Sequence, residues 1–124
     1  MLIDNKDGVV MDTETVLTWQ QGAVSKKYTW EGALKYCQNL SLAGYSDWRL
    51  PTIKELRTIV DKSRFALAIN IDYFPDTWPS SYWSSTTHTY CADYAWGMYF
   101  YLGYDRKYYK SRCLYVRAVR GGEE

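Results

Sequence analysis

Residues 47–61, DWRLPTIKELRTIVD, carry the clearest folding signal in this chain. Thr52 follows Pro51 directly, and Glu55 comes three residues later, which is the pattern of a capping box. In a capping box both side chains accept hydrogen bonds from backbone amides at a helix N-terminus, so a helix is predicted to begin here. Arg49 and Glu55 are expected to form a structural ion pair. The inner face of this helix is predicted to contain Ile53, Leu56, Ile59 and Val60.

A further helix is predicted upstream, in residues 29–44, TWEGALKYCQNLSLAG. Thr29 is a suitable N-cap for this helix, and Gly44 is a suitable stop. Apolar residues recur at helical spacing along the stretch, and Cys37 lies on the apolar face, which suits a buried thiol or a bridge to a strand. The predicted apolar face consists of Trp30, Ala33, Leu34, Cys37 and Leu40.

Strands are predicted on both sides of the helical region. Residues 7–21, DGVVMDTETVLTWQQ, place β-branched residues around two turn signals and predict two short strands. Residues 61–81 include two prolines and are expected to form a long loop, of the kind that often carries function. Three more strands are predicted in SYWSSTT (81–87), DYAWGMYFYLGY (93–104) and KYYKSRCLYVRAVR (107–120), with a hairpin turn at 102–105.

Alternation within the middle strand of this group predicts its two faces. Trp96, Met98 and Phe100 are expected to face the core, and the intervening residues, which include Tyr99 and Tyr101, are expected on the opposite face. The predicted fold is therefore α+β, with two helices packed on a small, largely antiparallel sheet that presents a Tyr-rich surface. The expected scaffold comprises Trp19, Trp30, Leu34, Leu56, Trp83, Trp96, Met98, Phe100 and Val116.

Composition and charge exclude several classes of function. The 124 residues correspond to one domain, and a formal net charge of +1 is too small for the basic footprint of a nucleic-acid-binding protein. No apolar run is long enough to cross a bilayer, and the first ten residues, MLIDNKDGVV, have no signal-peptide pattern. We therefore expect a single domain over residues 1–124, with no nucleic-acid partner and no membrane insertion.

The three cysteines and the single histidine match no metal-ligand spacing. Cys37, Cys91 and Cys113 are expected to be buried or surface thiols with at most one disulfide among them. His88 lies in the polar stretch TTHTY and is expected to be solvated. No metal and no cofactor are expected.

Several of the stretches described above occur together, in this order, in one known family. DGVVMDTETVLTWQ, the helical region up to residue 61, YWSSTT, AWGMYF and VRAVRG resemble the domain at the C-terminus of the Legionella collagen-like adhesins. The resemblance covers almost the whole chain, and DWRLPTIKEL, YWSSTT and VRAVRG are its most specific parts. It implies a C-type-lectin-like fold with adjacent N- and C-terminal strands, and a surface-exposed or extracellular location on a cell or a virion.

Departures from related sequences narrow what the resemblance implies. Family members often have Cys where this chain has Ala118, so a helix-to-strand disulfide through Cys37 is not expected, and a Cys91–Cys113 bond stays open. The calcium and sugar motifs of true C-type lectins are absent, which argues against calcium-dependent sugar binding. The fold is also similar to that of formylglycine-generating enzymes, but these need a closely spaced reactive cysteine pair that this sequence lacks. An oxidase of that type is the alternative from the enzyme class, and we expect no catalysis.

Residue types in the C-terminal half indicate a ligand-binding surface. Residues 71–122 contain no Asn, Gln or Glu, whereas Tyr, Ser, Thr, Asp and Arg are frequent. This bias is similar to that of the variable proteins of diversity-generating retroelements, in which Asn codons mutate to codons for such residues. Tyr supplies a large, rigid, amphipathic contact at low entropic cost, as in antibody paratopes. The region at about 82–115 is predicted to be variable, with the ligand contacts Tyr90, Tyr94, Tyr99, Tyr101, Tyr104, Asp105, Arg106, Tyr108, Tyr109 and Arg112.

The expected function is non-catalytic binding of a protein or glycan ligand on a cell or particle surface. A conventional adhesin domain that binds a glycan or sulfated polysaccharide is the alternative, because Tyr rings suit sugar rings and Arg106 and Arg112 suit sulfate or carboxylate groups. Strands also favour Tyr for packing alone. The sequence leaves the ligand, the source and the oligomeric state open.

Overall fold

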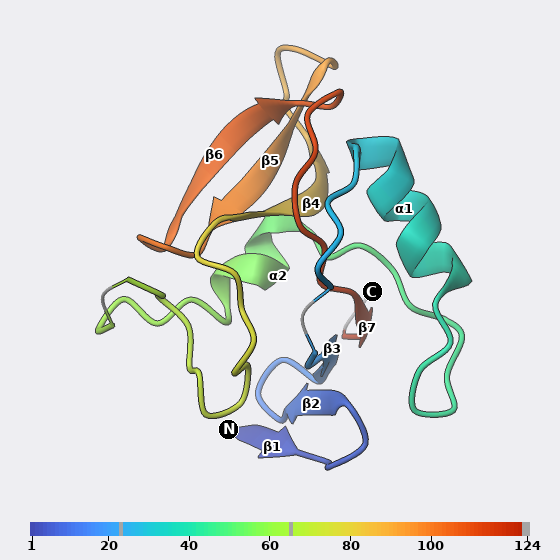
Figure 1. Cartoon of the computed structure of the whole chain (residues 1–124), viewed down its shortest axis with the longest axis vertical. Helices are drawn as coiled ribbons and strands as arrows, with labels where there is room; N and C mark the ends of the chain where they lie inside the picture. The colour runs from blue at the N-terminus through green and yellow to red at the C-terminus, as the bar shows by residue number, and fades with distance from the viewer. Residues whose placement is uncertain (23, 65, 123–124) are drawn as a thin grey trace.

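The computed structural model describes residues 1–22, 24–64 and 66–122. Two antiparallel sheets lie at opposite ends of the molecule, and helix α2 lies between them (Figure 1). The predicted α+β class and both predicted helices are confirmed. In chain order the elements are β1 (Leu2–Asp4), β2 (Val9–Asp12), β3 (Leu17–Gln20), α1 (Trp30–Asn39), α2 (Ile53–Arg57), β4 (Ser81–Thr87), β5 (Tyr94–Tyr99), β6 (Tyr104–Tyr109) and β7 (Val119–Gly121).

The first sheet has four strands in the order β1-β2-β3-β7. Strands β2 and β3 confirm the two predicted in residues 7–21, whereas β1 was not predicted. Trp19 in β3 pairs with Val10 on one side and with Val119 on the other, so its ring is held at the centre of the sheet. The first and last strands were expected to be adjacent. In the sheet, β1 and β7 instead form the two opposite edges, and β7 pairs with β3.

The second sheet has three strands in the order β4-β5-β6, and it confirms the predicted strands in residues 81–109. The β5–β6 turn occupies residues 100–103, not 102–105 as predicted, and Tyr104 already pairs with Tyr99. Gly103 supplies the positive φ of +82° that this turn requires, and a Cβ there would lie 2.7 Å from the Cβ of Ala68.

The stretch 107–120 is not one strand as predicted. Strand β6 ends at Tyr109, the chain turns, and it then runs beside β4, where Tyr115 forms a parallel bridge with Tyr82. The regular ladder resumes only at Val119, the first residue of β7, which pairs with Trp19 of β3. This path is a consequence of tertiary pairing, since the stretch joins two different sheets.

Both helix N-termini form where the sequence predicted them. Thr29 caps α1 by accepting a hydrogen bond from the Gly32 amide, and Thr52 and Glu55 form the complete capping box of α2. Helix α1 ends earlier than expected, however, with Leu40 as its C-cap in an extended conformation. Leu40 leaves the helix because it packs against the core together with Leu42, so Gly44 lies in the turn that follows.

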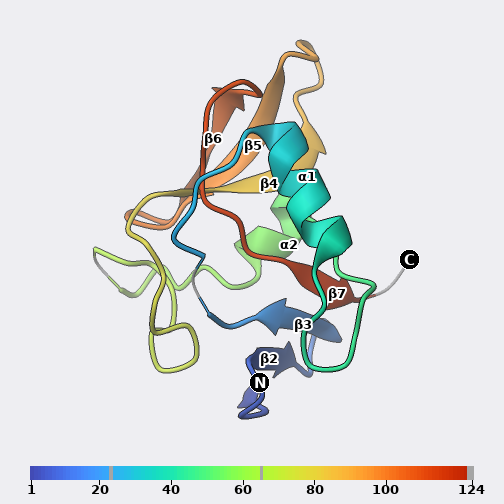
Figure 2. The same ribbon diagram turned by 45° about the vertical axis from the view of Figure 1, so that its right-hand side comes forward.

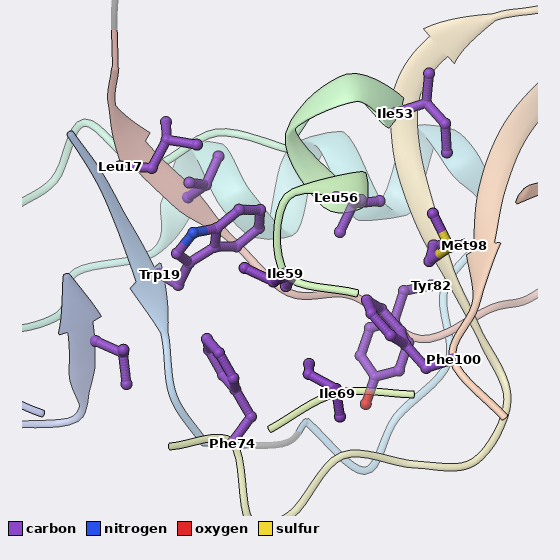
Figure 3. Close-up of a cluster of buried hydrophobic side chains, with 12 residues drawn as sticks. Leu17, Trp19, Ile53, Leu56, Ile59, Ile69, Phe74, Tyr82, Met98 and Phe100 are labelled. Atoms are coloured by element: carbon purple, nitrogen blue, oxygen red, sulfur yellow. The ribbon is translucent and has the colours of Figure 1, made fainter. Parts of the chain in front are cut away.

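The first part of the hydrophobic core lies between α2 and the two sheets (Figure 3). Trp19 lies beside Ile59 there, and Tyr82 meets Phe100 edge to face with ring centroids 5.3 Å apart. The loop predicted in residues 61–81 contributes Ile69 and Phe74, and it has no helix or strand in its described residues before β4, 61–64 and 66–80. Of the predicted scaffold, six residues are buried and Trp30, Leu34 and Trp96 are half-buried.

The second part of the core joins α1 to β4 and to the C-terminal segment, and Figure 2 shows α1 beside this strand. Ala33 and Cys37 of α1 pack with Trp83, and the Trp83 indole donates a hydrogen bond to the Tyr28 carbonyl at 2.7 Å. The two helices therefore pack on opposite faces of the three-stranded sheet, because Trp83 and Met98 belong to different faces and to different parts of the core.

Candidate ligand-binding sites

The predicted contact residues lie on both faces of the three-stranded sheet. Residues that pair directly across two antiparallel strands project to the same face, so the register assigns each side chain. The α1 side carries the pairs Ala95–Tyr108, Gly97–Arg106 and Tyr99–Tyr104, and the α2 side carries Tyr94–Tyr109, Trp96–Lys107 and Met98–Asp105. The single Tyr-rich face expected from the sequence is therefore two surfaces, because the tyrosines of β6 occupy both parities of the strand.

A pocket of about 260 Å³ opens on the α1 side of the sheet, and we call it the basic pocket. The lack of a side chain at Gly97 leaves room for the ring of Tyr108, since a Cβ there would lie 2.9 Å from the Tyr82 carbonyl oxygen and 3.2 Å from that ring. Tyr108 occupies that space and forms one wall. The pocket is lined by Lys27, Ser80, Ser81, Tyr99, Arg106, Tyr108, Arg112, Cys113 and Leu114.

The charge of the basic pocket is entirely positive. The Arg106 guanidinium lies over the rings of Tyr99 and Tyr108, with its carbon 5.4 and 5.7 Å from the ring centroids, and Arg112 lies 5.9 Å from that of Tyr108. Lys27 stands over the ring of Tyr115 at 5.2 Å. None of the three cations forms an ion pair within the described part of the chain, and no described acidic residue lines the pocket. These charges are therefore available to an anion.

Tyr108 belongs to the framework of the pocket as much as to its surface. Its ring meets Trp83 edge to face at 6.2 Å, and its hydroxyl is hydrogen-bonded to that of Ser81. Tyr99, by contrast, has exposed aromatic neighbours, with Tyr104 edge to face at 5.6 Å and Tyr101 tilted at 6.0 Å. These three rings extend the pocket wall toward the β5–β6 turn.

Asp105 faces α2 and is already occupied by a partner. The Arg57 guanidinium donates to its carboxylate at 2.5 Å, and this hydrogen bond lowers the pKa of Asp105 below its ordinary value. The pair joins β6 to α2. Among the predicted contacts, Asp105 is thus placed where it fixes the sheet on the helix.

A second group of rings lies on the α2 side, at the end of the sheet that carries the β4–β5 loop and points away from the four-stranded sheet (Figure 1). Tyr94 and Tyr109 stack with centroids 4.3 Å apart, and the Lys107 ammonium lies 5.2 Å from the Tyr94 centroid. A hydrogen bond with Tyr109 raises the pKa of Tyr94 to about 12. We call this group, His88, Tyr90, Tyr94, Trp96, Lys107 and Tyr109, the aromatic patch.

His88 stands inside the aromatic patch and is not the solvated loop residue expected from the sequence. Its ring is half-buried, with centroid distances of 5.3 Å to Trp96, 6.2 Å to Tyr94 and 6.1 Å to Tyr90. The β4–β5 pairing places it there, because the His88 amide donates to the Tyr94 carbonyl. Sequence reasoning missed His88 because the polar residues around it gave no sign of this pairing.

Five residues that line the basic pocket were also missed, namely Lys27, Ser80, Ser81, Cys113 and Leu114. Lys27 precedes α1 and is brought to the pocket by the bridge between Tyr28 and Leu114. The local sequence pattern does not predict this long-range contact. Ser81 begins β4 and lies opposite Tyr99. A signal for these positions would have required knowledge of the strand register.

The cysteines are separate from one another in the described structure. Cys37 is a buried thiol, as predicted, and burial raises its pKa to about 12. Cys91 and Cys113 are free, so the disulfide left open between them is not present. Within the described ranges, no three His, Cys, Asp or Glu side chains are placed to hold a metal ion.

Most of the chain matches the model of one known family. The family model described as the Lcl C-terminal domain matches residues 8–120. The chain belongs to this family. The match includes both helices and every residue of the basic pocket and the aromatic patch, and it confirms the resemblance seen in the sequence. Membership of the Lcl C-terminal domain family indicates an adhesin-related domain, which is associated with a surface or extracellular location.

The sequence matched none of the curated proteins with which it was compared. Among the helices of the described residues, none combines the length and the apolar character needed to span a membrane.

Proposed function

We propose that this Lcl C-terminal domain is a non-catalytic, surface-exposed adhesin domain with a C-type-lectin-like fold that binds an anionic glycan in the basic pocket. The observation that carries the proposal is the set of three cations, Lys27, Arg106 and Arg112, around one pocket without an acidic partner among the described residues.

The chemistry of the pocket suits sulfated or carboxylated sugars. Guanidinium groups form paired hydrogen bonds to sulfate and carboxylate oxygens. The rings of Tyr99 and Tyr108 orient the two guanidinium groups from below, since each guanidinium lies over at least one of them. The neighbouring Tyr104 is exposed and offers a ring face to the next sugar of a chain.

A catalytic role in the same pocket has less support. Cys113 is exposed and lines the pocket, but no described His, Asp or Glu lines it beside the thiol to act as a base. The oxidase alternative also needs a second nearby thiol, and the sequence offers no closely spaced partner. We therefore assign the pocket to binding.

The test compares a double variant of the pocket with a charge-matched control. Arg106→Ala combined with Arg112→Ala removes two pocket cations, whereas Lys35→Ala combined with Lys54→Ala removes two exposed cations from α1 and α2. Affinity for a sulfated hexasaccharide and its desulfated form is measured by calorimetry at two salt concentrations. The pocket variant is expected to lose about tenfold or more in affinity and part of the salt dependence, and the control to lose neither.

Equal losses in the two variants would mean that binding follows net charge and not the pocket. Equal affinity of the wild-type domain for the sulfated and desulfated sugars would remove the anionic group from the recognition. Either result overturns the proposed function.

A second candidate function, a receptor whose face is diversified by a retroelement, is favoured by one specific observation. The tyrosines proposed as diversified positions are all half-buried or exposed, whereas Met98 and Trp96, which that mechanism leaves fixed, pack on the core. The positions concerned are Tyr90, Tyr94, Tyr99, Tyr101, Tyr104, Tyr108 and Tyr109.

Deep sequencing of the gene and its flank in the source population tests this candidate. Substitutions confined to those codons, with a nearby copy that carries adenines at the same places, would establish it. Uniform codons without such a copy would eliminate it and leave the glycan-binding function unchanged.

A further inference from the structure

We infer that the aromatic patch is a second, separate binding site, and that it takes the pyranose rings of an uncharged glycan. This site lies on the α2 side of the sheet, and the basic pocket lies on the α1 side. The inference does not depend on the proposed function, because the two sites share no residue.

Two rings of the patch, those of Tyr90 and Tyr109, are exposed. Tyr90 is 92% exposed and Tyr109 is 54% exposed, although both are large aromatic residues that a monomeric domain gains nothing by exposing. Helix α2 covers this face of the sheet near Met98, where Leu56 packs in the same cluster. The opposite end of the face carries the stacked pair of Tyr94 and Tyr109.

Aromatic ring faces are electron-rich, and they attract the slightly positive C–H groups on the apolar face of a pyranose. Trp96 and His88 add a second ring pair, tilted by 35° with centroids 5.3 Å apart. The patch therefore offers two neighbouring aromatic pairs, which suits consecutive sugars of a chain better than a single small molecule.

The charge of the patch selects an uncharged ligand. Lys107 supplies one positive charge, which already interacts with the ring of Tyr94. Lys107 is the only Lys, Arg, Asp or Glu among the six residues of the patch, whereas the basic pocket carries three unpaired cations.

Polar groups at the edge of the rings can bind sugar hydroxyls. The Tyr90 amide donates to Nδ1 of His88 at 3.2 Å, so the neutral imidazole carries its proton on Nε2. Within the described structure Nε2 has no hydrogen-bond partner, so it is free to donate to a sugar hydroxyl. The phenol hydroxyls of Tyr94 and Tyr109 can both donate and accept.

One strand supplies a matched pair of variants for the test. Tyr104 and Tyr109 are the first and last residues of β6, and they are 44% and 54% exposed, but they project to opposite faces. Tyr109→Ala removes a ring of the aromatic patch. Tyr104→Ala removes a ring of similar exposure beside the basic pocket.

His88 is the only histidine of the chain, so its imidazole proton signals in an NMR spectrum report on the patch without ambiguity. The whole domain is titrated with three uncharged hexasaccharides, built from glucose, mannose or galactose. We expect at least one of them to shift the His88 signals with saturation at millimolar concentration. Tyr109→Ala should weaken this binding about tenfold, whereas Tyr104→Ala and the double variant Arg106→Ala/Arg112→Ala should leave it unchanged.

Absence of any shift with all three sugars overturns the inference, and so does equal weakening by Tyr104→Ala and Tyr109→Ala. Loss of both sulfated and uncharged ligands in the arginine variant would mean a single site, which contradicts this inference but not the proposed function. Failure of the wild-type domain to bind the sulfated hexasaccharide, with the His88 response intact, would contradict the proposed function but not this inference.

Discussion

The guanidinium of Arg117 donates to the main-chain carbonyl of Gln20, which lies 97 residues earlier in the chain. The same side chain donates to the Gln21 carbonyl at 2.9 Å and to the Thr77 hydroxyl at 3.0 Å, and it lies over the ring of Phe74. It is buried and has no ion pair within the described ranges, and burial lowers its pKa. Neutral carbonyl dipoles and an aromatic face therefore solvate this cation.

We expect replacement of Arg117 to cost more stability than any exposed substitution. Arg117→Met preserves an apolar stem but leaves two carbonyls and a hydroxyl without their donor, which should lower the free energy of unfolding by about 3 kcal/mol or more. Arg117→Lys keeps the charge and should cost less. Urea unfolding measures both, and a Met variant as stable as the wild type would show that these hydrogen bonds are dispensable.

The ion pair at the start of α2 should make stability depend on acid pH. Burial opposes the shift, but hydrogen bonds from Arg49 and from the Thr52 amide lower the pKa of Glu55 below 4.5. A carboxylate with a lowered folded-state pKa stabilises the fold above its unfolded pKa, and this contribution is lost as the pH falls through the folded value. Glu55→Gln keeps the capping box and removes the charge, so it should cost about 1 kcal/mol at pH 7 and progressively less as the pH falls through the folded-state pKa of Glu55.

The control for this titration is Glu31→Gln, because Glu31 is exposed in the first turn of α1 and forms no ion pair in the described structure. Thermal unfolding is followed for both variants between pH 3 and pH 7. A Glu55→Gln deficit that stays constant over this range contradicts the assignment of the stabilisation to the carboxylate.

Gly97 connects the packing of the sheet to the basic pocket. Gly97→Ala would place a methyl group 2.9 Å from the Tyr82 carbonyl oxygen and 3.2 Å from the Tyr108 ring. We expect a loss of about 1–3 kcal/mol in stability and a weaker affinity for the sulfated hexasaccharide, since the ring must move. Gly22→Ala is the matched control because, among the described residues other than its chain neighbours, no atom lies within 4 Å of its added Cβ. Unchanged sugar affinity in Gly97→Ala would separate the ring position from ligand binding.

The tyrosines should differ in what their removal does to stability. Tyr108→Ala removes a ring that packs on Trp83 and a hydroxyl bonded to Ser81, so we expect a loss of about 1–2 kcal/mol. Tyr101 is 40% exposed in the β5–β6 turn, and its replacement by Ala should cost less than about 0.5 kcal/mol. Melting temperatures compare the two, and similar losses would place both rings in the same structural class.

Much of the fold could be predicted because its signals are local. The capping box at Thr52 and Glu55, the N-cap at Thr29 and the alternation around Met98 depend on neighbouring residues, and each has its expected place. The predictions for the end of α1 and for the path of residues 110–118 were wrong for a different reason. There the chain follows long-range partners, such as the pairing of Tyr28 with Leu114, which override local preference.

The candidate sites show the same division. Composition drew attention to the tyrosines of β5 and β6 and to Arg106 and Arg112, but it could not divide the strand residues between two faces, since that division depends on the register of β5 against β6. Lys27 and His88 were missed because tertiary pairing, not local pattern, brings them to their sites.

The first and last tyrosines of strand β6 are five positions apart. Because this separation is odd, the strand presents one tyrosine on each face of the sheet. Loss or gain of a single residue within β6 would shift the register, so that every side chain beyond that point would project to the opposite face of the sheet. Replacement of one side chain by another leaves that division intact. A lineage that keeps the length of this strand constant can therefore change the side chains of one surface without disturbing those of the other.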